Sequence, residues 1–353
     1  MAIDNIYRSY TAYNTRRWLF LAAMLLLLAA SVIVSISYGA ADMSLAEIAR
    51  ALFTANGQQH AILWALRVPR AVMAALVGFG LGISGTVFQA VLRNPLASPS
   101  TLGVSSAAGF GAVCVILFAG TAPSNLAVAL GSFACALFSA GFIFTIARMK
   151  GASSETLILT GVAQMFLFSA LTSLGQYLGT VDQLVNIVFW SLGSLSKAGW
   201  MEIALTTGMV LLPTPLLLWH AWDFNLLAMG DDTAKISGVN VERLRLWSIA
   251  LASLATAGAI CFTGVIGFVG MMIPNMLAVL VGGCRRRLIA LSAWAGALFL
   301  LAVDTLARNL VWPLDLPVGL MAAFAGESQA NRKYLAFAAA ADKEGMHQVA
   351  KLF

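Results

Sequence analysis

Charged residues are scarce in this chain. Of its 353 residues, 21 are Lys or Arg and 15 are Asp or Glu, so charge occupies 10% of the positions, whereas 60% are hydrophobic and the mean hydropathy is +0.87. An ordinary soluble domain carries roughly 25% charged residues. A chain with so few could not cover a water-exposed surface with them, which excludes a water-soluble enzyme.

Cysteine and histidine are too few and too scattered for the usual metal sites and disulfide frameworks. The four cysteines follow none of the paired spacings of a zinc motif, and we interpret them as small buried hydrophobic residues. The chain has three histidines, and no two of them are placed as the axial ligands of a membrane haem would be. We therefore predict no metal site, no cofactor and no catalytic residue.

The chain also lacks two features that would power transport if it were a membrane transporter. The phosphate-binding pattern G-x-x-x-x-G-K-[ST] does not occur, so no P-loop cradles ATP. Among residues in the apolar segments, only Asp304 and Arg308 are ionisable, and their spacing of four predicts a pair on one helical face. A proton-driven carrier would normally hold more such groups. The energy for transport is therefore expected to come from another subunit.

What the chain does have is long runs without any charge. These runs cover residues 18–41, 71–92, 94–147, 156–181, 203–222, 246–284 and 288–303. A helical crossing needs about 20 apolar residues, because each residue adds about 1.5 Å and the hydrocarbon is about 30 Å thick. Five runs fit one crossing each, and the two longest must fold back as two crossings each. The first run is longer than the core of a signal peptide, so we interpret it as a retained helix.

These runs predict an all-α polytopic membrane protein with nine transmembrane helices before the C-terminal segment. The expected helices lie near 17–38, 69–92, 103–120, 124–147, 154–177, 201–221, 245–262, 266–283 and 288–311.

Lys and Arg are enriched in the cytoplasmic loops of membrane proteins. A cytoplasmic N-terminus places twelve of them inside, namely Arg8, Arg16, Arg17, Arg93, Arg148, Lys150, Lys235, Arg243, Arg245, Arg285, Arg286 and Arg287. Five then lie outside, namely Arg50, Arg67, Arg70, Lys197 and Arg308, and the C-terminal tail is left out. We predict a multi-pass protein of the bacterial cytoplasmic (inner) membrane with its N-terminus in the cytoplasm.

Glycines inside the second predicted helix indicate close packing. Residues 80–85 match the dinucleotide-binding pattern G-x-G-x-x-G, but that pattern works only at a turn from strand to helix. Gly78 and Gly82 have the small-xxx-small spacing that lets helices approach closely in lipid. We expect Gly78, Gly82 and Gly85 to serve helix packing.

Two regions outside the apolar runs are candidates for contact with partners. The longest inner connection, Ala221 to Leu244, is polar and glycine-punctuated, so it can form a short helix and turn that a soluble partner grips, or a plain solvated connector. On the outer side, Arg67, Arg70 and Arg308 lie at helix ends. They could meet acidic residues of an external partner or anchor the helices at the membrane surface.

Several distinctive sequence blocks occur along the chain. They are RVPR at 67–70, QAVLRNPLA at 89–97, LGVSS at 102–106, GVIGFVG at 264–270 with IP at 273–274, DTLAR at 304–308 and LPVG at 316–319. These blocks closely resemble the signature of the iron-chelate and vitamin B12 ABC importer permeases, the FecCD type. They follow the family's order across residues 15–320, about nine tenths of the chain. Asn275 departs from the pattern, because the family commonly has His there.

The resemblance implies a permease that does no covalent chemistry and has ten helices per subunit. It implies a second permease subunit in a homodimer or pseudo-dimer, with a homodimer expected here, a cytoplasmic ABC ATPase dimer, an extracytoplasmic substrate-binding protein, surrounding membrane lipid and no nucleic acid. It assigns Arg67, Arg70 and Arg308 to docking of the binding protein. It assigns the inner loop to coupling with the ATPase, through Gly230, Asp231, Asp232, Ala234, Gly238 and Val239.

The C-terminal segment departs from the family. Counting from Val318, only nine uncharged residues precede Glu327, less than half a crossing, so a stable tenth span is not expected. Residues 322–353 instead resemble the start of rubrerythrin, in which the residue matching Glu327 is an iron ligand. One helix cannot supply a di-iron site. Glu344 and His347 have the Glu-x-x-His spacing, but in the resembling family the ligand pair comes further along the chain. We expect a permease domain at 1–321 and a rubrerythrin-like amphipathic helix at 322–353.

The sequence leaves open which cargo is carried and whether the chain is able to transport it. The expected cargo is a ferric siderophore or a related iron chelate, with vitamin B12 or haem as alternatives. A non-functional truncated hybrid and a proton-driven carrier are the competing classes. Selection is expected to rest with the external binding protein, since the permease offers few polar residues along its helices.

Overall fold

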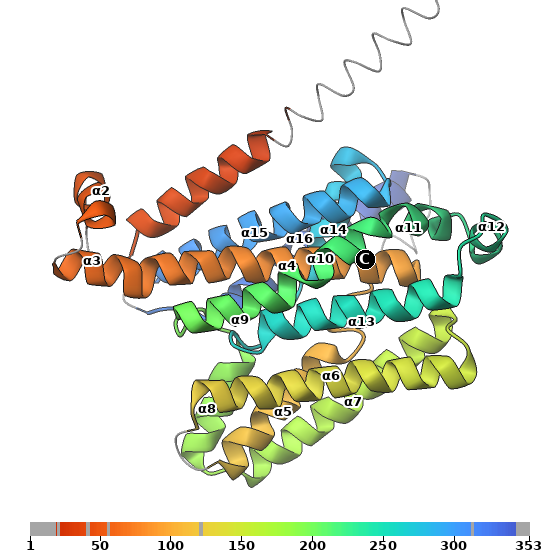
Figure 1. The fold of residues 1–353 in the computed structure, drawn as a ribbon, viewed down its shortest axis with the longest axis horizontal. Coiled ribbons are helices and arrows are strands. Elements are labelled where there is room, and N and C mark those ends of the chain that lie inside the picture. The colour runs from red at the N-terminus through yellow and green to blue at the C-terminus, as the bar shows by residue number, and fades with distance from the viewer. Residues whose placement is uncertain are drawn as a thin grey trace, which may run out of the picture.

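The computed structural model describes residues 19, 22–39, 43–54, 57–119, 123–311 and 314–343, and within these ranges the regular structure is helical (Figure 1). After an apolar helix at Ala22–Ser37, the helices are α2 (Leu45–Phe53), α3 (Gln58–Ile62), the π-helix η1 (Leu63–Arg67), α4 (Val68–Leu92), α5 (Val104–Phe118), α6 (Asn125–Lys150), α7 (Ser154–Leu178), α8 (Val181–Ser191), α9 (Trp200–Leu211), α10 (Pro213–Trp219), α11 (Ala221–Ala228), α12 (Asp231–Ile236), α13 (Val241–Ile260), α14 (Val269–Val281), α15 (Arg285–Asn309) and α16 (Val318–Lys343).

The chain is an all-α polytopic membrane protein, and within the described residues each of the nine predicted segments overlaps a helix, or two successive helices, α9 and α10, in the case of 201–221. Five helices of the described chain are long and apolar enough to cross a membrane, namely Gln58–Leu92, Asn125–Lys150, Ser154–Leu178, Trp200–Trp219 and Arg285–Asn309. The two longest uncharged runs do fold back, the first into α5 and α6 and the second into α13 and α14. The structure adds α2 and α8, which the charge pattern did not predict.

Helix α4 forms the centre of the bundle, and 78% of the most apolar stretch of its span is buried. Glycine makes this possible, because a Cβ atom at Gly78 would meet the carbonyl of Gly296 and one at Gly82 would meet the carbonyl of Ser292, both in α15. Gly85 lies equally close to Gly270 of α14. Small residues allow such close helix contact, so α4, α14 and α15 pack backbone against backbone.

The bundle has two distinct ends along its long axis. Figure 1 places α2 and α3 at one end and α12 at the opposite end, with α4 running between them. The 25 residues of α4 extend over about 37 Å at 1.5 Å per residue. We call these the α3 end and the α12 end.

Helix α16 crosses the expected junction near residue 321 without a break. Its first turns are packed on the bundle, since Val318 and Ala322 are buried and a Cβ atom at Gly326 would meet the ring of Phe268. Further along, large apolar side chains such as Phe337 are about half exposed. Glu344 and His347 lie outside the described residues.

Candidate functional sites at the two ends of the bundle

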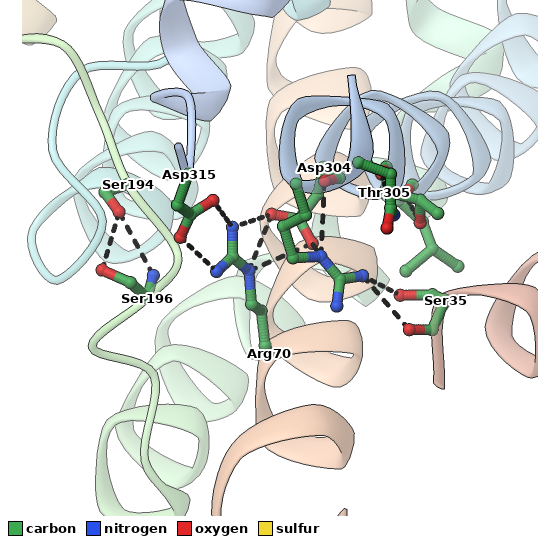
Figure 2. Close-up of polar contacts among 10 residues, drawn as sticks. Ser35, Arg70, Ser194, Ser196, Asp304, Thr305 and Asp315 are labelled. Carbon is green, nitrogen blue, oxygen red and sulfur yellow. Dashed lines mark hydrogen bonds and ion pairs between the residues drawn. The ribbon is translucent and has the colours of Figure 1, made fainter. Parts of the chain in front are cut away.

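A buried carboxylate organises the α3 end. Asp304 in α15 is 0% exposed and accepts hydrogen bonds from Arg70 Nε at 2.9 Å (Oδ1) and 3.2 Å (Oδ2) (Figure 2). Arg308, one helical turn further along, has its Nε 3.2 Å from Asp304 Oδ2. The pair predicted from the four-residue spacing is therefore confirmed, and Asp304 is shared by two arginines.

Two residues that the sequence did not single out complete this network. Arg70 also donates to Asp315, with Nη1 2.7 Å from Oδ2 and Nη2 2.9 Å from Oδ1. Arg308 Nη2 donates to the hydroxyl of Ser35 at 2.7 Å, and Figure 2 shows Ser35 approaching from the first helix. The network thus joins α4, α15, the loop before α16 and the helix at 22–37. Asp315 directly precedes the LPVG block at 316–319, and this position was the one sequence feature that could have indicated its role.

The structure gathers the three predicted docking arginines at the α3 end. Arg67 is 5% exposed, and its Nη1 donates to the carbonyls of Ile36 at 2.7 Å and Ser37 at 3.0 Å. The side chains of Arg70 and Arg308 are 12% and 10% exposed. All three guanidinium groups are therefore engaged within the chain, and contact with an external partner stays a prediction.

The short helix α2 offers a more accessible acid at the same end. Ser44 caps the helix and Glu47 accepts from its backbone N–H at 2.7 Å and its hydroxyl at 2.8 Å, a capping box. These hydrogen bonds from Ser44, with a smaller one from Gln59, hold the pKa of the partly exposed Glu47 below its ordinary value. Glu47 lines an open pocket of about 740 Å³ together with Asn309 of α15.

The predicted coupling segment lies at the α12 end. Gly230 and Gly238 flank α12 with φ angles of +124° and +88°, which favour glycine. Ala234, within α12, is fully buried, and its carbonyl accepts a hydrogen bond from the N–H of Val239 at 3.0 Å. Asp232 is exposed, whereas Asp231, the first residue of α12, turns toward the bundle. The predicted short helix is thus present as a compact, glycine-bounded turn of helix.

A buried arginine receives Asp231. Arg245, near the start of α13, is 2% exposed, and its Nη1 and Nη2 donate to the two carboxylate oxygens of Asp231 at 2.8 and 2.9 Å. Arg93, which follows α4, places its Nη2 3.2 Å from the same carboxylate. From the sequence, Arg245 was expected only as one of the inner cations. Its position between two leucines, 244 and 246, was the available sign of burial.

Sequence blocks far apart in the chain meet between the two ends. The Nε2 of Gln89 in α4 donates to the carbonyls of Pro95 at 2.8 Å and Met271 at 3.0 Å. Asn275 Nδ2 donates to the same two carbonyls, each at 2.9 Å. The residue that departs from the family pattern therefore ties α14 to the loop after α4.

No group of three or more His, Cys, Asp or Glu residues that could hold a metal ion occurs within the described ranges.

Comparisons with known proteins place these features in a family. Residues 26–327 match the FecCD transport family, and residues 319–353 match the rubrerythrin family. The hemin transport system permease protein HmuU of Yersinia pestis is 34% identical over 312 residues, covering 87% of this chain and 92% of that protein. The Fe(3+) dicitrate transport system permease protein FecD of Escherichia coli (strain K12) is 36% identical over 280 residues, covering 78% and 87%.

A solved structure agrees with these sequence matches. It is described as an inward-facing conformation of a metal-chelate type ABC transporter, and it aligns with a TM-score of 0.79 and 31% identity over 88% of this chain and 96% of that chain. Permeases of this kind transport cargo, are not enzymes, and work with an ATPase and a substrate-binding protein. The chain therefore belongs to the FecCD transport family and is an ABC importer permease, a multi-pass protein of the inner membrane.

Proposed function

We propose that this permease imports an iron chelate, such as a ferric siderophore, across the bacterial cytoplasmic membrane. One relative is named for ferric dicitrate, and the similar solved structure is described as metal-chelate type, whereas the relative named for hemin supports an alternative. A large polar chelate cannot enter hydrocarbon unaided, because each unpaired polar group costs several kcal/mol there. Vitamin B12 and haem are the alternative cargoes for the same mechanism.

The observation that carries the proposal is the placement of two candidate contact regions at opposite ends of one helix. The residues at the start of α4 join the α3 end, and Arg93 at its other end reaches α12. In our proposal the α12 segment, Gly230 to Val239, seats in the ATPase, and the α3 end receives the binding protein. Asp315, 43% exposed, and Glu47 are the accessible acids of that face.

The proposed orientation puts the α12 end and the N-terminus in the cytoplasm. Arg148 and Lys150 end α6 and Arg285, Arg286 and Arg287 begin α15, so five cations flank membrane helices at their predicted inner ends. Cytoplasmic helix ends are enriched in such residues. This supports the inside-positive assignment made from the sequence.

We further propose that two copies of the chain form the path and that lipid surrounds them. Large apolar side chains such as Phe138 in α6, Leu159 and Phe166 in α7 are 65 to 71% exposed. An apolar surface of this kind is stable only against lipid or another subunit. A path between two subunits, opened to each side in turn, would spare the cargo any contact with hydrocarbon.

The proposed division of the chain is a permease domain at 1–321 and a rubrerythrin-like segment at 322–353. The two family matches support it, and they overlap at residues 319–327, within the first turns of α16. The competing proposal is that the joined segment leaves a hybrid that inserts into the membrane without transporting.

Uptake into proteoliposomes that contain the permease with its cognate ATPase and binding protein tests this function. Iron-labelled ferric chelate should accumulate only with hydrolysable ATP, and unlabelled vitamin B12 should not compete. Uptake of labelled vitamin B12 or hemin instead would reassign the cargo. Normal insertion without any uptake would favour the non-functional hybrid, and uptake that needs a proton gradient but no ATPase would contradict the ABC mechanism.

A further inference from the structure

Arg245 is placed unusually for a basic residue of a membrane protein's inner surface. Most such arginines face water, whereas Arg245 is 2% exposed and belongs to the part of α13 that packs on the bundle. A buried guanidinium needs its donors satisfied, because the charged group has lost its water. Arg243, two residues earlier in the same helix, is exposed, so a basic side chain in this part of α13 can reach water.

Two backbone carbonyls and one hydroxyl outside α13 satisfy part of this requirement. Arg245 Nη1 donates to the carbonyl of Ala152 at 2.9 Å, and Nη2 donates to the hydroxyl of Ser154 at 3.2 Å, at the turn that joins α6 to α7. Arg245 Nε donates to the carbonyl of Val91 at 3.3 Å, in the last turn of α4. One side chain therefore holds the inner ends of α4, α7 and α13 together.

The remaining donors reach the proposed coupling helix. Asp231 accepts from both Nη atoms of Arg245, a two-point contact that fixes orientation as well as distance. Asp231 is also the first residue of α12, and its side chain is 28% exposed. Arg93 contacts the same carboxylate from the end of α4. Any displacement of α12 must therefore move this carboxylate relative to three membrane helices or carry them with it.

We propose that Arg245 is a positioning residue that transmits movement of α12 to α4 and α7 through Asp231. The proposal rests on the proposed function, because it takes α12 as the element that the ATPase moves. Arg245 touches neither cargo nor nucleotide. Its guanidinium is planar and forms several directed bonds at once, so it can convey a shift of the carboxylate to the carbonyls of Val91 and Ala152.

The test compares two variants that break the contact with two that spare it. Asp231→Asn removes the charge and keeps the size, and Arg245→Gln removes the guanidinium. Glu242→Gln and Arg243→Gln change exposed residues at the start of α13, outside the α12 segment, by the same chemistry. Asp231→Glu restores the charge. Each full-length variant is assembled with the cognate ATPase and binding protein in proteoliposomes, and complex formation, ATP hydrolysis and iron-chelate uptake are measured separately.

The readout is the amount of cargo taken up per ATP hydrolysed. We expect Asp231→Asn and Arg245→Gln to assemble and hydrolyse ATP while this ratio falls about fivefold or more, the lower end of typical coupling between sites. Asp231→Glu should recover most of the ratio, and the two control variants should keep it. A residue that only supports the fold would lower assembly, hydrolysis and uptake together.

Two results would overturn the proposal. An unchanged ratio in Asp231→Asn, with intact assembly, would mean that the contact transmits nothing. A parallel loss of assembly and uptake in Asp231→Asn would make the contact a structural support only. Failure of the proposed function appears differently, because the unmodified chain itself would then bind no ATPase or take up no chelate.

Discussion

The α3 end and the α12 end are built from the same residue types but bury opposite charges. At the α3 end the fully buried member is an acid, Asp304, and two arginines converge on it. At the α12 end the buried member is Arg245, and its acid, Asp231, is partly exposed. The first network joins long helices to one another, whereas the second joins long helices to a helix of six residues.

We interpret the network at the α3 end as a structural contact that holds helices together, and the network at the α12 end as a contact that transmits movement. Loss of the Asp304 carboxylate would leave Arg70 bonded to Asp315 and Arg308 bonded to Ser35, but it would leave two guanidinium groups close together in a site that is nearly closed to water, with no buried charge to balance them. Loss of the carboxylate at the α12 end would still leave Arg245 bonded to backbone carbonyls. We therefore expect the α3 end to govern the stability of the fold and the α12 end to govern how ATP hydrolysis is coupled to transport.

The largest loss of stability is expected from a substitution that disturbs the packing of α4, because this helix connects the two ends. In Gly82→Leu the new side chain would meet the backbone of Ser292 and push α4 away from α15. We expect the folded fraction in detergent, measured by size-exclusion chromatography, to fall about tenfold or more, since overpacking here displaces backbone rather than a flexible side chain.

Gly141→Leu in α6 is the matched control, because nothing lies within 4 Å of a Cβ atom at that glycine. Equal yields from the two variants would contradict the close contact of α4 with α15.

Asp304→Asn should destabilise the α3 end alone. Removing one member of a buried ion pair costs about 3–5 kcal/mol, and chemical unfolding in detergent measures this loss. Asp315→Asn is the control at 43% exposure, where at most about 1 kcal/mol is expected because water screens the charge. Should the two substitutions prove equally costly, the buried acid would not be the centre of the network.

The smallest effect concerns the capping box of α2. Ser44→Ala should destabilise this helix by about 0.5–2 kcal/mol, measured by hydrogen exchange of α2, while exchange in α12 stays unchanged. The hydrogen bonds from Ser44 lower the pKa of Glu47 in the folded protein. The stabilisation that they give is therefore fully present above the ordinary pKa of a glutamate, and it is lost as the pH falls through the lowered pKa. Faster exchange in both helices would mean that the two ends are not independent.

Much of the helical framework was predictable because lipid imposes a strict rule. A stretch such as 156–181 lacks charge because every residue must be stable in hydrocarbon, so its limits mark α7 closely. Helices outside this rule were missed. Helix α8 carries Asp182 and Gln183, and its capping box at Thr180 is a local signal that the charge pattern does not include.

The candidate sites were predictable as positions but not as contacts. The sequence placed Arg70 and Arg308 at the same membrane side, and four-residue spacing predicted the pair with Asp304. It could not show that Arg70 turns to Asp315, which is 245 residues away, because such contacts depend on how helices pack. Arg245 illustrates the same limit, since counting it as an inner cation described its side and not its burial.

Sided labelling of single cysteines tests most directly that the two ends face opposite compartments. Phe53 at the α3 end and Ile236 in α12 are 89% and 88% exposed, and either can be changed to Cys in a chain whose four native cysteines are replaced by Ala. In intact cells, an impermeant maleimide should label Phe53→Cys, while Ile236→Cys should react only after the membrane is opened. Labelling of Ile236→Cys from outside, or of both positions from the same side, would contradict the proposed arrangement.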